Sequence, residues 1–143
     1  RYEGGITDIR VMVQKEHNGR WEVTGMACRV GKPGAITSNI SGGGRAIRVE
    51  TVLRKVFSGS KQVNQIIETI IFVAINAAVS VEDYLGNCGE VGVDIGVDKY
   101  GKIWFIEANL RPARHVFTLT GETETRQKSI ETPLLYARYL AGF

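Results

Sequence analysis

A long run of apolar residues at helical spacing constrains the fold of this chain more than any other feature. Between Val63 and Leu85 such residues recur at i, i+3, i+4 and i+7 for more than five turns, which predicts one helix over residues 61–85 with a wide apolar face. The positions are Val63, Ile66, Ile67, Ile70, Ile71, Ala74, Ala77, Ala78, Val81 and Leu85. Ser60 is placed to cap its start, and Gly86 follows its end. A face of this width has to be buried against another element.

Alternating segments predict the sheet on which the helix packs. Apolar and polar residues alternate over residues 6–14, as a half-buried strand requires. Asn18 and Gly19 favour a tight turn into a second strand over residues 21–30. The apolar side of the first strand carries Ile9, Val11 and Val13, and the other side carries Asp8, Arg10, Met12 and Gln14.

The rest of the chain predicts a second hairpin and little regular structure around it. Residues 31–44 are too rich in Gly, Ser and Pro for a helix, and residues 46–52 form a weak element of uncertain type. Two strands are predicted over residues 91–108, and a short final helix starts at Pro133. The expected fold is α+β: a single domain with an antiparallel sheet, covered on one face by the long helix.

Composition excludes several functional classes. Eighteen Lys and Arg residues oppose 15 Asp and Glu residues without long runs of one sign, so nothing favours nucleic acid as a partner. The most apolar stretch is broken at Asn76, so no membrane span is expected. Cys28 and Cys88 have no metal-ligand spacing, which fits free thiols in the cytoplasm. Because the chain opens on Arg1 with neither Met nor a signal peptide, we expect a fragment of a longer protein.

The second hairpin carries the most informative polar residues. If Asp98 and Gly101 close a four-residue turn, Asp94 lies opposite Phe105 and diagonal to Glu107. One face then holds Gly92, Asp94, Gly96, Ile103, Phe105, Glu107 and Asn109, with open space beside the glycines, and the core face holds Val91, Val93, Ile95, Val97, Trp104 and Ile106.

Two carboxylates and an amide on one face suit a hard cation such as Mg²⁺, which prefers oxygen ligands. The predicted ligands are Asp94, Glu107 and Asn109. The alternative is a solvated polar face, which a one-residue β-bulge between the carboxylates would favour.

These residues resemble a known family. Asp94, followed thirteen positions later by Glu107-Ala-Asn109, is similar to the magnesium-binding end of ATP-grasp enzymes. Thr7-Asp8-Ile9-Arg10-Val11, and Arg29 followed by Ser38-Asn39 and Gly42-Gly43, resemble the ribosomal-protein glutamate ligase branch. The closest resemblance, over residues 25–34 and 37–39, is to the endospore coat-associated, YheC/YheD-like ATP-grasp family.

The resemblance implies a set of roles. Asp94, Glu107 and Asn109 would hold Mg²⁺ or Mn²⁺, and Arg29 and Arg114 would act in catalysis. ATP would be held by Arg10, Arg29, Asn39, Gly42, Gly43, Gly44 and Arg111. Backbone amides of a glycine loop and the planar fork of an arginine are suited to phosphate oxygens.

The implied activity is ATP-dependent ligation of an unknown carboxylate to an amine or thiol, through an acyl phosphate. The adenine hinge of such enzymes belongs to a preceding lobe, so residues 1–143 correspond to the C-terminal half, and the isolated chain is not expected to turn over ATP. A non-catalytic, nucleotide-binding or structural protein associated with the spore coat is the alternative. An RNA-binding module is disfavoured because Trp104 is predicted on the core face.

Overall fold

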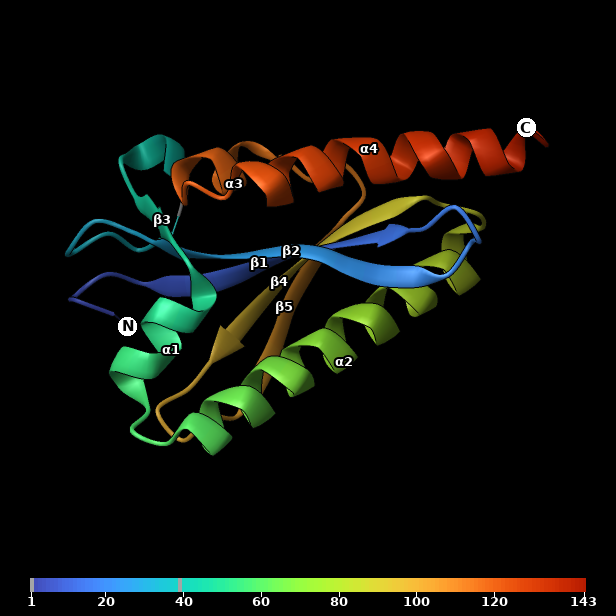
Figure 1. Ribbon diagram of the computed structural model, residues 1–143. Coiled ribbons are helices and arrows are strands. Elements are labelled where there is room, and N and C mark those ends of the chain that lie inside the picture. Colours follow the sequence, from blue (N-terminus) through green and yellow to red (C-terminus); the bar gives the residue numbers. More distant parts are fainter. Residues whose placement is uncertain (1, 39) are drawn as a thin grey trace.

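The computed structural model describes residues 2–38 and 40–143 and contains one five-stranded sheet with helices on both faces (Figure 1). The sheet order is β3-β2-β1-β4-β5, and every neighbouring pair is antiparallel. In chain order the elements are β1 (Thr7–Lys15), β2 (Trp21–Val30), the 3-10 turn η1 (Ile40–Gly42), β3 (Arg45–Ile47), α1 (Val49–Val56), α2 (Ser60–Leu85), β4 (Glu90–Val97), β5 (Ile103–Asn109), α3 (His115–Leu119) and α4 (Thr123–Leu140). The α+β prediction is confirmed.

Helix α2 packs one apolar face into the main core, as its periodicity predicts. Its buried residues are Val63, Ile66, Ile70, Ala74 and Ala78, which pack with the valines and isoleucines of β1 and β4. By length and hydropathy alone α2 would also meet a criterion for a membrane span, yet this face lies against the sheet. The helix starts at Ser60 with Gly59 as its N-cap, so the predicted capping role of Ser60 is wrong.

The second face of the sheet is also covered, which the sequence did not indicate. Helices α3 and α4 lie over it, on the side opposite α2 (Figure 1). Met12 and Ala27 pack there against Val116 and Phe117 in a small separate core. Gly25 makes this contact possible, because a Cβ at its position would lie 2.8 Å from the Phe117 ring.

Helix α4 begins ten residues before the predicted start at Pro133, which lies inside it. A proline has no N–H to donate to the carbonyl four residues earlier, which is that of Ser129. Two side chains replace the missing donor: Gln14 Nε2 lies 2.7 Å and Arg114 Nε 2.9 Å from the Ser129 oxygen. The helix therefore tolerates Pro133 because β1 and the segment before α3 satisfy its freed carbonyl.

The register of the second hairpin differs from the prediction. The turn closes between Asp98 and Lys102, one residue later than assumed, with Gly101 at φ 85°. Val97 therefore pairs with Ile103, and Ile95 with Phe105.

A β-bulge then shifts the register, so that Asp94 pairs directly with Glu107. The bulge brings the two carboxylates together, where it was expected to separate them.

This register also reverses the predicted faces of residues 103–106, whereas Glu107 and Asn109 keep the predicted face. Ile103 and Phe105 pair with core-facing residues, whereas Trp104 pairs with Gly96 on the other face. Trp104, Phe105 and Ile106 are each about half exposed. The assignment of Trp104 and Ile106 to the core is therefore wrong, and with it the argument that Trp104 is buried away from a nucleic acid.

Candidate phosphate and metal site

A network of buried charges lies on the sheet face opposite α2, at the centre of the sheet. Arg10 on β1 and Asp94 on β4 are cross-strand partners. The Arg10 guanidinium donates from Nε to Asp94 Oδ1 at 2.5 Å and from Nη2 to Oδ2 at 3.1 Å. Both residues are buried, so the pair forms a desolvated, two-point ion pair.

Arg29 extends the network to a second carboxylate. It is the cross-strand partner of Asp8 and donates to both oxygens of that carboxylate, at 2.7 and 2.6 Å. Its Nη2 also donates to Asp94 Oδ2 at 2.6 Å. Ser38 Oγ donates to Asp8 Oδ2 at 2.6 Å. Two arginines and two aspartates thus neutralise one another in the interior.

The pKa values follow from this pairing. Burial opposes the charged form of Asp94, but the Arg10 hydrogen bonds and the positive charges of Arg10 and Arg29 outweigh it and lower the pKa. Burial likewise opposes the charge of Arg29, and the hydrogen bonds and charges of Asp8 and Asp94 raise its pKa above the ordinary arginine value. Asp94 and Arg29 therefore stay ionised at neutral pH.

The other predicted metal ligands come from β5. Glu107 is paired with Asp94 and is exposed, and Asn109 is paired with Gly92. Cross-strand partners project to the same face, so the three predicted ligands share one face. Asn109 Oδ1 accepts a hydrogen bond from the Arg111 backbone at 2.8 Å. Within residues 2–38 and 40–143, no three acidic, His or Cys side chains converge closely enough to form a metal cluster.

The segment after β5 folds back over the sheet at Gly92. A Cβ at that position would lie 2.6 Å from the Pro112 Cβ and 3.5 Å from the Arg10 Cδ. The space beside Gly92, predicted to be empty, is therefore occupied. Arg111 is exposed next to the site, whereas Arg114 forms an ion pair with Glu90 and supports α4.

The predicted glycine loop lies at the start of β3. A Cβ at Gly43 would meet the Lys32 side chain, with its Nζ 2.5 Å away, and Gly43 has φ 86°. Ala46 on β3 pairs with Arg29, which brings this strand to the network. Among the described residues no hydrogen bond joins Gly42, Gly43 or Gly44 to Asp94. Asn39 lies outside the described residues.

The sequence analysis assigned no role to two residues of the buried charge network, Asp8 and Ser38. Both lie in segments that carry the family resemblance. Asp8 precedes Arg10 by two positions on β1, so the two project from the same face. This alternation was the available signal. Nothing in the residues around Ser38 indicated that its hydroxyl reaches Asp8.

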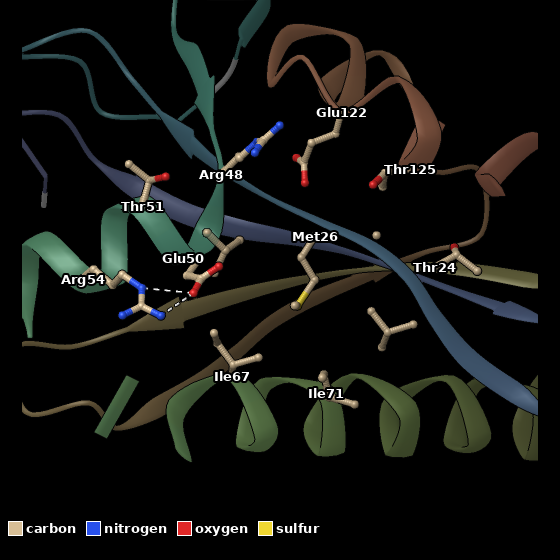
Figure 2. Close-up of a pocket in the computed structure, with 13 residues that line it drawn as sticks. Thr24, Met26, Arg48, Glu50, Thr51, Arg54, Ile67, Ile71, Glu122 and Thr125 are labelled. Carbon is tan, nitrogen blue, oxygen red and sulfur yellow. Dashed lines mark hydrogen bonds and ion pairs between the residues drawn. The ribbon is translucent and has the colours of Figure 1, made fainter. Parts of the chain in front are cut away.

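A cavity of about 690 Å³ lies elsewhere, at the edge of β2 (Figure 2). Met26, Ile67 and Ile71 line its apolar side, and Arg48 and Glu122 lie at its upper side in this view. Strand β3 pairs only with the end of β2, which leaves this part of the edge open. None of the predicted site residues lines the cavity.

The family profile described as YheC/D like ATP-grasp matches residues 1–140. The chain belongs to the YheC/YheD-like ATP-grasp family. This confirms the family resemblance carried by residues 25–34 and 37–39, and the broader ATP-grasp resemblance carried by Asp94, Glu107 and Asn109.

Two curated relatives support the same assignment. The endospore coat-associated protein YheD of Bacillus subtilis (strain 168) is 32% identical over 145 residues, which cover 98% of this chain and 30% of that protein. The endospore coat-associated protein YheC of the same organism is 26% identical over 133 residues, covering 93% of this chain and 36% of that protein. The chain therefore spans about a third of the length of both relatives.

A solved structure shows a weaker likeness. N5-carboxyaminoimidazole ribonucleotide synthetase from Thermotoga maritima is 16% identical with a TM-score of 0.40, over 91% of this chain and 29% of that chain. A likeness at this level identifies neither residues nor roles.

Proposed function

We propose that this domain binds the phosphates of ATP and their Mg²⁺ or Mn²⁺ ions in an ATP-dependent ligase site. The observation that carries the proposal is the direct pairing of Asp94 with Glu107, next to Arg10 and Arg29 on one sheet face. Membership of an ATP-grasp family supports the nucleotide assignment.

The donor set fits a hard cation. Glu107 is exposed and has the oxygen chemistry that Mg²⁺ prefers, and Asn109 contributes an amide oxygen on the same face. Bound there, the metal would neutralise phosphate charge and polarise a phosphoryl oxygen. Asn109 Oδ1 accepts one hydrogen bond, from the Arg111 backbone N–H, whereas both oxygens of Asp94 accept hydrogen bonds from arginine side chains.

Because of this difference, the binding of phosphate and the binding of the metal ion depend on each other. Arg10 and Arg29 can release Asp94 only if another anion takes its place, and phosphate oxygens match the guanidinium fork. Asp94 is then free to contribute its oxygens to a cation. Phosphate and metal binding should therefore reinforce each other, with each ligand weak when offered alone.

The ligase activity itself follows the family resemblance. Transfer of a phosphoryl group to a carboxylate depends on positioning and charge neutralisation more than on a nucleophilic side chain. We assign Arg29 to hold transferred phosphate oxygens, and Arg10 and Arg111 to orient the phosphate chain. Arg114 was predicted to be catalytic, but its ion pair with Glu90 favours a supporting role.

A non-catalytic role at the spore coat is the second candidate, because both curated relatives are named endospore coat-associated proteins. Such a protein could bind nucleotide without ligation. The two candidates differ in ATP turnover by the full-length protein, not in the binding site described above.

The phosphate end can be tested with the 143-residue chain by calorimetry. We expect magnesium tripolyphosphate to bind with about the same affinity as MgATP, because the contacts assigned here are all to phosphates. AMP should not bind measurably. Arg29→Gln should weaken binding of both triphosphates at least tenfold, and Arg54→Gln should not change it. Equal binding of AMP and MgATP, or no effect of Arg29→Gln, would overturn the proposal.

A further inference from the structure

Strand β5 is the free edge of the sheet, and it is unusually apolar for such an edge. It pairs with β4 on one side, and no described strand pairs with its other side. Trp104 is 52% exposed and Phe105 and Ile106 are each 53% exposed. A free edge of this kind is a template for pairing with another chain. Two charges and a bulge limit such pairing here, but the exposed apolar residues lie together between Lys102 and Glu107.

An apolar groove runs beside the same edge. Phe105 lies on the α2 side of the sheet and lines a cavity of about 490 Å³ with Val73, Ala77, Val81, Tyr84 and Leu85. Tyr84 is 87% exposed. The apolar surface therefore continues from the strand onto the C-terminal half of α2.

The charges of β5 complement a second copy of the same strand. Lys102 precedes the apolar residues and Glu107 follows them. In an antiparallel pair the two ends meet, so Lys102 of each copy comes opposite the Ile106–Glu107 end of the other. Opposite charges facing across a strand pair stabilise it, and like charges destabilise it.

The side-chain faces select one register. About a two-fold axis perpendicular to the sheet, only residues on the same face can be partners. Centring the axis on Trp104 pairs Trp104 with its own copy and Ile103 with Phe105, both of which are core-facing. Centring it on Phe105 would place Ile103 opposite Glu107, and centring it on Glu107 would place two carboxylates opposite each other.

We propose that β5 mediates a homodimer in which two copies pair antiparallel about Trp104 and form one continuous ten-stranded sheet. Trp104 is positioned for this contact, because its Nε1 donates to Asp98 Oδ2 at 3.2 Å and Lys102 Nζ lies 4.2 Å from its ring centroid. The interface is one strand pair with a strip of α2, so the dimer should be weak and dissociate reversibly.

The test is the mass of the 143-residue chain by light scattering and sedimentation over a range of concentrations. We expect a monomer–dimer equilibrium. Trp104→Lys should raise the dissociation constant at least tenfold. Leu134→Lys, at an exposed apolar position on α4, should leave it unchanged. A monomer at all concentrations up to about 1 mM would overturn the proposal and leave the edge to another segment or partner.

Two further variants test the register even if Trp104→Lys fails to fold. Lys102→Glu places a carboxylate opposite Ile106 and near Glu107 of the other copy at both ends of the strand pair. It should weaken the dimer about tenfold, and adding Glu107→Lys should restore it. In a Cys88→Ser background, Trp104→Cys should cross-link to its own copy under mild oxidation, and Leu134→Cys should not. Failure of the second charge change to restore the dimer, or cross-linking at Leu134→Cys alone, would overturn the register.

Discussion

The most informative perturbation of the buried network is Arg29→Gln. It removes two hydrogen bonds to Asp8 and one to Asp94. Ser38 is then the only described side chain that donates to Asp8, and Arg10 alone pairs with Asp94. Leaving a buried carboxylate without its cation costs about 3–5 kcal/mol. We expect a loss in this range from the free energy of unfolding at pH 7.

The exposed pair Arg54–Glu50 provides a matched control. Arg54 also donates twice to one carboxylate, at 3.0 and 2.6 Å, but its side chain is 53% exposed. A pair of this kind at i, i+4 contributes about 0.3–0.5 kcal/mol. Arg54→Gln should therefore change stability by no more than about 0.5 kcal/mol, although it removes nearly the same bonds.

Urea unfolding at pH 7 and pH 5 measures both variants. A carboxylate that has lost its cation gains a proton more readily in the folded state. The stability that Arg29→Gln loses relative to the unsubstituted chain should therefore shrink as the pH falls. The deficit of Arg54→Gln should stay small at both values. Equal losses for the two variants, or a deficit for Arg29→Gln that does not depend on pH, would refute the buried-charge account.

Three further outcomes follow from the fold. The lowered pKa of Asp94 stabilises the folded state at pH values above the ordinary aspartate pKa of about 3.9. This contribution is lost as the pH falls through the lowered pKa. The stability measured in urea should therefore fall less steeply with acid for Asp94→Asn. Gly92→Ala should cost about 1–3 kcal/mol through overpacking against the covering proline, whereas Gly96→Ala, whose nearest neighbours lie 3.7 Å away, should be tolerated in thermal unfolding. Gln14→Leu should cost about 1–3 kcal/mol, and clearly less in a Pro133→Ala background that returns an N–H to the helix, as a double-mutant cycle would measure.

The elements that could be located from the sequence have a clear period or follow a recognisable turn. Strand β1 and helix α2 have apolar residues that repeat every two or about 3.6 positions, and strand β2 follows the turn at Asn18-Gly19. Helix α4 could not be located, because its start at Thr123 is polar and Pro133 was interpreted as a first-turn residue. The carbonyl freed by Pro133 accepts hydrogen bonds from Gln14 on β1 and from Arg114. Both residues lie too far from Pro133 in the sequence for a local pattern to indicate these contacts.

The spacing of the polar residues on β4 and β5 predicted that they share a face, but not the register that pairs them. The spacing placed Asp94 diagonal to Glu107, whereas the observed register makes them direct cross-strand partners. The turn that sets this register closes at Lys102, and a bulge then shifts the pairing by one further residue. The spacing of residues in the sequence indicates neither feature. The spacing also could not show that Arg10 and Arg29 occupy the oxygens of Asp94, since that depends on the order of three strands.

Mn²⁺ binding followed by electron paramagnetic resonance tests whether the arginines release Asp94 to a cation when phosphate binds. The 143-residue chain alone should bind Mn²⁺ weakly. With tripolyphosphate added, the amount of bound Mn²⁺ should be at least tenfold higher than in a control that contains the same Mn²⁺ and tripolyphosphate without protein. Glu107→Gln and Asp94→Asn should abolish this gain, while Glu68→Gln, on the exposed side of α2, should preserve it. Mn²⁺ binding that is independent of tripolyphosphate, or unchanged by both substitutions, would contradict the account.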